Sequence, residues 1–342
     1  MRSGAPIPGA AAVAAAAGAG AGPRGAIPHG GGPRGGGASD IAMRRPGSRA
    51  EARAAVWLLA PALLVIGVFF LLPVGAALLL SLTDFDIYAV ADLHNLRFVG
   101  LGNYRRLLAD PLFWTALRNT FYFAFAGGPL SVLVSLGAAL LLDSRLARWK
   151  TLYRTVFFAP VVTTLVAVAV VWRYLYHPHF GLINRVLGWI GLPAIDWLGD
   201  PRWSMPAIIV LAVWKNFGYN MIVFLAGLQN IPVTLYEAAR IDGAGWWRQL
   251  RHVTLPMLAP TFLFVGVITM IGYFQLFTEP YVITRGEGGP VNSTLSVVLL
   301  MYKQGFRYWN MGYAAALAFV LFLVILGVTA LQLLFRRRGG AR

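Results

Sequence analysis

The sequence predicts an all-α integral membrane protein with six transmembrane helices and a helix–turn–helix in the loop between the fourth and fifth spans. Hydrophobic residues make up 58% of the 342 residues and charged residues only 12%, against roughly 25% charged in an ordinary soluble domain. The mean hydropathy is +0.65, and long blocks such as residues 308–335 carry no charge. A soluble fold of this length could not bury so much apolar surface.

Six apolar blocks are long enough to cross a bilayer, since about 20 apolar residues cover a hydrocarbon core of roughly 30 Å. They lie near residues 55–82, 117–142, 155–176, 205–228, 260–282 and 311–335. Prolines such as Pro61 and Pro160 fall inside these blocks and are expected as kinks. The predicted organisation is a tail over residues 1–54, a six-span domain over 55–335 and a basic tail over 336–342.

The first tail is rich in Ala, Gly, Pro and Arg, with runs such as GAGAGPRGAIPHGGGPRGGG. This composition cannot bury a core, so we expect disorder. The tail is either dispensable or the product of a start placed too early, with Met43 as the alternative start. Removing residues 1–42 is therefore expected to leave activity intact.

The basic excess of 29 Lys and Arg over 13 Asp and Glu follows the topology. Eighteen Lys and Arg lie in the two tails and the loops 143–154 and 229–259, against eight in the loops on the other side. The positive-inside rule places both termini and the 229–259 loop in the cytoplasm. The charge therefore indicates contact with anionic membrane lipid, and no nucleic-acid partner is expected.

The residues for catalysis are few. There is no cysteine, and Lys150-Thr151 follows Trp149 where a phosphate-binding loop needs Gly. His177 and His179 have a metal-like spacing, but no carboxylate lies close in sequence, so a solvated loop is the better interpretation. We expect no catalytic residue, metal or cofactor.

The loop after the fourth span reads QNIPVTLYEAARIDGAGWWRQLRHVTLPMLAP and predicts helix, turn, helix. Pro232 opens the first helix, which continues through good helix formers. Gly243 and Gly245 break it. A second helix is expected over residues 246–253, and Pro256 is expected to stop it before the fifth span. A rigid element of this kind could be gripped by a partner and push on both adjoining spans.

This spacing resembles the EAA loop in the permease subunits of binding-protein-dependent ABC importers, although Val253 stands where that family usually has Ile. The resemblance implies that the loop docks on a separate ATPase subunit and couples ATP-driven closure to the spans. It implies these ATPase-coupling residues: Glu237, Ala238, Ala239, Asp242, Gly243, Ala244, Leu255 and Pro256. Glu237 would make polar contacts with the ATPase, and Gly243 would form the corner.

Further motifs resemble the sugar-type permeases, the maltose and glycerol-3-phosphate kind. They are FVGLGNY at 98–104, DPLFW at 110–114, Asn119-Thr120, GLIN at 181–184, DWL at 196–198, Thr284 with GGP at 288–290, and NST at 292–294. The resemblance implies a carbohydrate importer in the bacterial cytoplasmic membrane, with ATP hydrolysis on a partner, so that this chain is not an enzyme. Its partners would be a second permease subunit, an ATP-binding subunit dimer, an extracellular solute-binding protein and the sugar.

Polar residues inside the fourth and fifth spans suggest a substrate pathway, because a charge within a span costs about 2.5–3.5 kcal/mol on insertion scales and normally faces a cavity or a partner. The candidates are Lys215, Asn216, Tyr219, Tyr273 and Gln275. The alternative is hydrogen bonding between helices or subunits, with Lys215 pairing with Glu279 or with a partner residue.

Two other classes of function compete with the importer. An ion-coupled secondary carrier would show inverted repeats and mid-membrane carboxylates. An integral membrane transferase would need clustered carboxylates, whereas the 13 acidic residues are scattered.

Overall fold

The computed structural model describes residues 49–92, 94, 96–144 and 148–339. The chain divides into two units, residues 1–61 and 62–342. The described part of the first unit is the start of helix α1, which runs Arg49–Ile66. This helix begins before the predicted end of the tail at residue 54, because Arg, Ala and Glu are good helix formers. The predictions for residues 1–48, including disorder and the start at Met43, lie outside the described residues.

The regular secondary structure of the described residues is helical, and their β-pairing is limited to one antiparallel bridge between Thr83 and Phe98. After α1 come α2 (Leu72–Ser81), α3 (Ile87–Ala91), α4 (Gly102–Ala109), α5 (Pro111–Tyr122), α6 (Gly128–Asp143), α7 (Lys150–Val162), α8 (Leu165–Leu175), α9 (Leu182–Trp189), α10 (Pro201–Gln229), α11 (Val233–Ile241), α12 (Trp246–Gln249), α13 (Leu255–Met257), α14 (Ala259–Phe274), α15 (Thr278–Ile283), α16 (Val297–Tyr302) and α17 (Met311–Gly339). Between them lie the π-helical turns η1 (Gly67–Leu71), η3 (Phe123–Gly127), η4 (Leu250–Thr254) and η6 (Lys303–Arg307), and the 3₁₀ turn η5 (Pro290–Asn292).

Five helical stretches within the described residues are long and apolar enough to cross a membrane. They are Arg53–Ser81, Pro111–Asp143, Pro201–Gln229, Ala259–Ile283 and Met311–Leu334, and they confirm five of the predicted spans. The second starts earlier than the predicted residue 117, because the Asp110 side chain caps the helix and Pro111 occupies its first position. The last helix continues to Gly339, into the predicted tail.

The third span differs from the prediction of one helix over residues 155–176. The structure has α7 and α8 there, bent by 99° at a break of two residues, and only the pair taken together gives a sixth span. Pro160 interrupts the hydrogen bonding of α7 near its end, and the backbone of Thr163 and Thr164 is extended. The Thr163 hydroxyl donates to the Pro160 carbonyl across the break.

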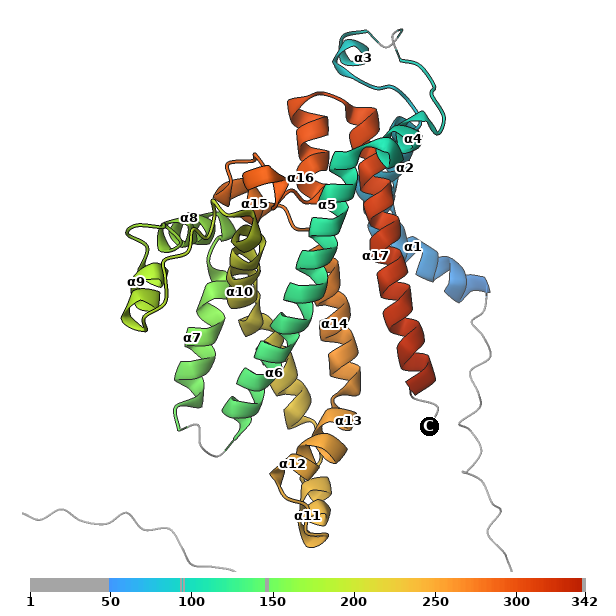
Figure 1. The fold of residues 1–342 in the computed structure, drawn as a ribbon. Helices are drawn as coiled ribbons and strands as arrows, with labels where there is room; N and C mark the ends of the chain where they lie inside the picture. Colours follow the sequence, from blue (N-terminus) through green and yellow to red (C-terminus); the bar gives the residue numbers. More distant parts are fainter. Residues whose placement is uncertain (1–48, 93, 95, 145–147, 340–342) are drawn as a thin grey trace, which may run out of the picture. The chain divides into compact units, whose positions relative to one another are not determined.

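Helix α10 is the centre of the packing, with 61% of its apolar window buried against 22–39% for the spans α5–α6, α14–α15 and α17. It packs on α6, α7 and α14 (Figure 1). The approach of α7 is close, because a Cβ atom added at Gly218 would collide with the Phe157 carbonyl. The long central helix thereby fixes the positions of its polar side chains.

The loop between α10 and α14 has the predicted helix, turn, helix form. Helices α11 and α12 project at the lower end in Figure 1, away from α15 and α16. The expected stop at Pro256 is wrong. The chain continues through η4 into α13, where Pro256 takes one of the first two positions, which need no amide donor. The last residue of α13 is Met257, and Leu258 caps this helix.

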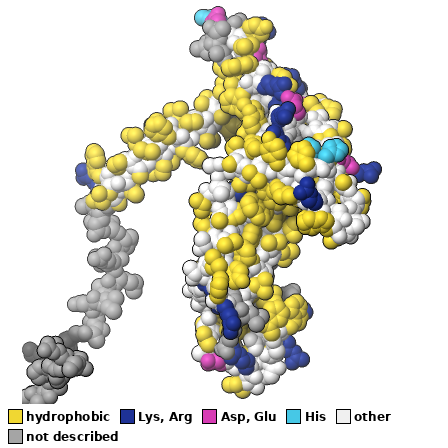
Figure 2. All heavy atoms as spheres, turned by 90° about the vertical axis from the view of Figure 1, so that its left-hand side faces the viewer, with side chains coloured by type: hydrophobic (Ala, Val, Ile, Leu, Met, Phe, Trp, Pro, Cys, Tyr) yellow, Lys and Arg dark blue, Asp and Glu magenta, His cyan; other side chains and the backbone are white. Residues whose placement is uncertain are grey.

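Figure 2 shows one face of the molecule. Lys and Arg side chains gather near the end that carries α11 and α12 and near the opposite end, and hydrophobic side chains cover much of the part between. This distribution is the one expected of a chain that crosses a bilayer.

Candidate functional site

The predicted pathway residues converge on one cavity of about 450 Å³. Its volume lies within the roughly 300–1,000 Å³ of small-molecule sites. The cavity is bounded by the end of α7, the start of α8, the middle of α10, the second half of α14 and the start of α15. All five predicted residues line it: Lys215, Asn216, Tyr219, Tyr273 and Gln275.

Helix α10 contributes two adjacent stripes of the cavity wall. Lys215 and Tyr219 are four residues apart, and Asn216 and Asn220 repeat that spacing one position further on. The side chain of Tyr219 is 44% exposed, so an aromatic ring is available to a ligand. The Asn216 amide donates to the Ala212 carbonyl at 2.9 Å, one turn earlier in the same helix. Asn220 is buried and donates to the Thr269 hydroxyl of α14 at 3.0 Å.

Lys215 has a structural partner that the sequence did not reveal. Its ammonium group donates to the backbone carbonyl of Val161 at 3.0 Å. That carbonyl lies in the last turn of α7, where the break before α8 leaves it without an intrahelical donor. Within the described residues no ion pair joins Lys215 to Glu279, which was one of the two alternative partners considered for Lys215, although both residues line the cavity.

The break between α14 and α15 supplies the opposite wall. Helix α14 ends at Phe274, and Gln275 caps it in a non-helical conformation. The buried Ser296 hydroxyl donates to the Leu276 carbonyl at 2.6 Å, which satisfies one of the backbone groups freed by the break. The Tyr273 hydroxyl is buried and accepts or donates no hydrogen bond with any described residue. A polar ligand could supply that partner.

The cavity wall also contains polar groups outside the five predicted pathway residues. Asn220, Thr269, Thr278 and Glu279 also line it. Glu279 is 8% exposed and lies in α15, just after the break. In the sequence, Glu279 lies near the outer end of the predicted span, which suggested only a pairing role. The helix break that precedes it has no clear signal in the sequence, so its place in the cavity wall could not be predicted.

The second candidate site is the turn between α11 and α12. We call residues 237–244 the coupling corner. Gly243 has φ +72°, a left-handed conformation that favours glycine, and the Ala244 amide donates to the Ala239 carbonyl at 2.8 Å. The Gln249 side chain donates to the Ala244 carbonyl at 2.7 Å. The turn is therefore closed by hydrogen bonds on both sides of Gly243.

The coupling corner is tied to the spans on either side. The Tyr236 and Thr254 hydroxyls share a hydrogen bond of 3.0 Å between α11 and η4. Tyr236, Val253 and Leu255 pack on a buried cluster that includes Leu228 at the end of α10 and Leu258 at the start of α14. The segments on both sides of the corner therefore pack against the two helices that bound the cavity.

The outer surface of the corner is open. Glu237, Ala238, Asp242, Gly243 and Pro256 are exposed, and Ala239, Ala244 and Leu255 are partly buried. Ile241 is 87% exposed, and Trp246 and Trp247 are 67% and 66% exposed. Neither Glu237 nor Asp242 forms an ion pair with any residue that the structure describes. Such apolar exposure beside free carboxylates is typical of a surface that a partner covers.

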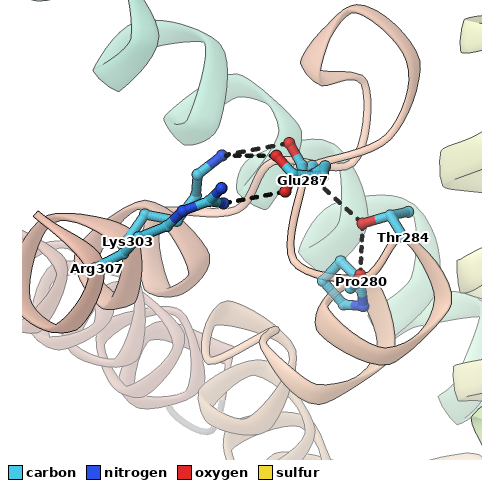
Figure 3. A network of polar contacts seen from close by, with 6 residues as sticks. Pro280, Thr284, Glu287, Lys303 and Arg307 are labelled. Atoms are coloured by element: carbon cyan, nitrogen blue, oxygen red, sulfur yellow. Dashed lines mark hydrogen bonds and ion pairs between the residues drawn. The ribbon is translucent and has the colours of Figure 1, made fainter.

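A polar network holds the loop after α15 (Figure 3). The Arg307 guanidinium of η6 donates to the Glu287 carboxylate at 3.0 Å, and Lys303 lies 3.9 Å from it. The contact with Arg307 holds the pKa of the Glu287 carboxyl below its usual range. The Thr284 hydroxyl donates to the Pro280 carbonyl and accepts from the Gly288 amide.

Comparison with known proteins bears on what these sites do. Residues 131–339 match the family described as binding-protein-dependent transport system inner membrane component. The chain is 41% identical over 281 residues to the lactose transport system permease protein LacF of Rhizobium radiobacter, covering 81% of this chain and 92% of that protein. It is 34% identical to the sn-glycerol-3-phosphate transport system permease protein UgpA of Pectobacterium atrosepticum, covering 82% and 93%.

A solved structure shares the fold. It is a bacterial ABC transporter involved in the import of the acidic polysaccharide alginate. One of its chains superposes with a TM-score of 0.67 at 23% identity, over 84% of this chain and 98% of that chain.

Proposed function

The chain belongs to the family of binding-protein-dependent transport system inner membrane components, and from that premise we propose that it is the permease subunit of an ABC importer for a carbohydrate or carbohydrate derivative. Family membership confirms the resemblance drawn from the loop spacing, and the chain is a multi-pass protein of the cytoplasmic membrane. Membership of this family favours the importer over an ion-coupled carrier or a membrane transferase. The sugar substrate is supported by relatives such as the lactose permease protein.

The observation that carries the proposal is the cavity between α10, α14 and the two helix breaks. Its wall offers amides, one cation, one carboxylate and an exposed tyrosine ring. Amide and charged groups suit the hydroxyls of a sugar, and an aromatic ring suits its C–H face. The residues proposed to contact the sugar are Lys215, Asn216, Tyr219, Tyr273 and Gln275.

The mechanism we propose is alternating access. A loaded solute-binding protein docks on the side of α15 and α16, and a separate ATPase dimer binds the coupling corner from the cytoplasm, where both termini also lie. ATP-driven closure of that dimer moves the corner, and the cavity changes the side to which it opens. The corner supplies the place of contact, while the free energy comes from the different affinities of the ATPase states for it. A second permease subunit completes the pathway.

Within the corner, each residue type suits a different contact. We assign polar contacts with the ATPase to Glu237 and Asp242, whose carboxylates are free and exposed. The small side chains of Ala238 and Ala239 permit close approach, and the exposed Ile241 adds apolar area. Leu255 and Pro256 join the corner to the α14 span. ATP hydrolysis then takes place on the partner and not on this chain.

The test is reconstitution of the chain with its partner permease, ATPase and binding protein in proteoliposomes, followed by a screen of sugars for ATPase stimulation and uptake. The proposal expects one class of sugar to stimulate both. Asn216→Ala and Tyr219→Ala should lower uptake of that sugar at matched expression. Ile222→Ala, a similarly exposed position of α10 outside the cavity, should not. Stimulation by no sugar would contradict the proposed function, and full uptake in both cavity variants would contradict the proposed pathway.

A further inference from the structure

Four aromatic rings form a continuous row from the cavity to the surface. We call Phe277, Tyr281, Tyr302 and Phe306 the aromatic row. Phe277 lines the cavity, and its ring centroid lies 5.2 Å from those of both Tyr281 and Tyr302. The Tyr302 ring in turn lies 5.2 Å from Tyr281 and 5.4 Å from Phe306. Each separation lies within the contact range of aromatic pairs.

The ring farthest from the cavity is the most exposed of the four, which distinguishes the row from a core cluster. Phe277 and Tyr302 are partly buried, whereas Tyr281 is 37% and Phe306 is 64% exposed. A run of contiguous exposed aromatic surface that leads into a cavity marks a ligand surface more often than a packing defect.

Charged side chains beside the row argue against burial in lipid tails. Lys303 and Arg307, which flank Phe306 in the sequence, both contact the Glu287 carboxylate (Figure 3). A charged network of this kind is unfavourable inside the hydrocarbon layer. The outer end of the row therefore faces an aqueous or interfacial region, where a water-soluble ligand can reach it.

The same network fixes the two halves of the row relative to each other. Tyr281 lies in α15, and the loop that follows α15 carries Glu287. Phe306 lies in the π-helical turn η6, together with Lys303 and Arg307. The contacts of Glu287 therefore join the element of Tyr281 to that of Phe306, and the rings are held in order without closing the surface above them. π-Helical turns of this kind are frequent at functional sites.

We propose that the aromatic row is a carbohydrate-binding track, on which sugar rings stack as they pass between the outer surface and the cavity. The inference rests on the proposed function and adds to it a binding site outside the cavity. The flat ring faces match the C–H faces of a sugar and leave its hydroxyls in water. Several weak neighbouring sites suit passage, because a ligand must be able both to enter and to leave each of them.

The charges near the track define what it recognises. Lys303 and Arg307 are already paired with Glu287, so neither of these two cations is free for an acidic group, and the row itself offers ring faces. The track should therefore select for the sugar ring and tolerate differences in substituent charge and chain length.

The experiment uses the assembled importer in proteoliposomes, with the sugar that stimulates the wild-type ATPase most strongly. Uptake and ATP hydrolysis are measured together for Tyr302→Leu and Phe306→Ala, which remove one ring each. The sugar taken up per ATP hydrolysed should fall about two- to tenfold, as expected from the loss of one aromatic contact. Tyr302→Phe, which keeps the ring, should restore most of the ratio. Phe322→Ala, a 55% exposed phenylalanine of α17 outside the row, should leave it unchanged.

Three other results of this experiment would contradict the proposal that the aromatic row binds sugar. An unchanged ratio in both ring-removal variants would show that sugar does not use the row. If uptake and ATP hydrolysis fall equally and the partner permease is lost from the complex, the row is a subunit interface. If they fall equally and the fall depends on lipid composition, the row is a membrane contact. Wild-type complexes that no sugar stimulates would instead contradict the proposed function, and the track with it.

Discussion

Lys215 combines two requirements in a single side chain. Its charge lies in the wall of the cavity with only 8% of the residue exposed, and it hydrogen-bonds a carbonyl in the last turn of α7. The C-terminal end of a helix carries partial negative charge, so a cation is favourable there. The ammonium group therefore stabilises the broken third span while remaining beside any bound ligand. The cavity role and the structural role, which the sequence left as alternatives, are compatible.

Replacing Lys215 with Met should destabilise the chain, because the Val161 carbonyl loses its donor in a mostly buried position. The expected loss is about 1–3 kcal/mol of unfolding free energy, measured by thermal unfolding of the detergent-purified chain. Lys150 is a matched control, since its ammonium group also donates to a backbone carbonyl, that of Asp143, but at an exposed site. Lys150→Met should cost less than about 0.5 kcal/mol. Equal stability of the two variants would contradict the structural role of Lys215.

The motif asparagines show what residue patterns could and could not predict. The sequence motifs indicated a family, but they did not show that each asparagine ties distant backbone segments together. Asn103 donates to the carbonyls of Ser81 and Thr83, and Asn119 donates to those of Asn292 and Leu295. Backbone carbonyls such as these, and that of Val161, carry no residue-specific signal. Their partners therefore appear only once the chain is folded.

At the scale of elements, long apolar helices were predictable, whereas of the breaks only a kink at Pro160 was expected. The hydrophobic blocks gave five spans within a few residues of their observed positions, because lipid imposes both length and composition. Tertiary hydrogen bonds from Lys215 and Ser296 satisfy backbone carbonyls at the 99° bend between α7 and α8 and at the break after Phe274. Those two breaks shape the cavity. The sequence thus identified five of its polar residues while missing the geometry that brings them together.

The turn at Gly243 gives a prediction for the coupling corner. A valine there would be strained by the positive φ, at a cost of about 1–2 kcal/mol, and we expect Gly243→Val to lose most sugar-stimulated ATP hydrolysis while still inserting in the membrane. Gly243→Asn should retain more, because asparagine tolerates this conformation. Gly245 is also in open space but has an ordinary φ of −68°, so Gly245→Ala should behave as wild type. Normal stimulation in Gly243→Val would refute the role of the turn.

At the scale of the whole molecule, the structure joins two sites through α10 and α14. The coupling corner connects these two helices at one end, and both helices line the cavity further along their length. The aromatic row begins at the cavity and leads away from the corner through α15, α16 and η6. The proposed sugar path and the proposed ATPase contact thus lie at different places along the same two helices, as alternating access requires.

The distribution of Lys and Arg predicts the orientation of the chain in the membrane, with the coupling corner on the cytoplasmic side and the loop between α15 and α16 outside. The chain has no cysteine, so one introduced thiol reports one position. Ile241→Cys at the corner should react with a membrane-impermeant maleimide only from the cytoplasmic side. Val291→Cys, at an 86% exposed position of the loop between α15 and α16, should react only from outside. The reverse pattern would contradict the topology.

The most direct measurement is the reaction of Ile241→Cys with that maleimide, in inside-out vesicles, with and without the ATPase subunit. Bound ATPase should protect this thiol, and a thiol-to-amine crosslinker placed there should capture the ATPase subunit. Phe322→Cys on α17 should show neither effect. An Ile241→Cys thiol that reacts equally fast in both preparations, and captures no ATPase, would contradict the coupling role of the corner.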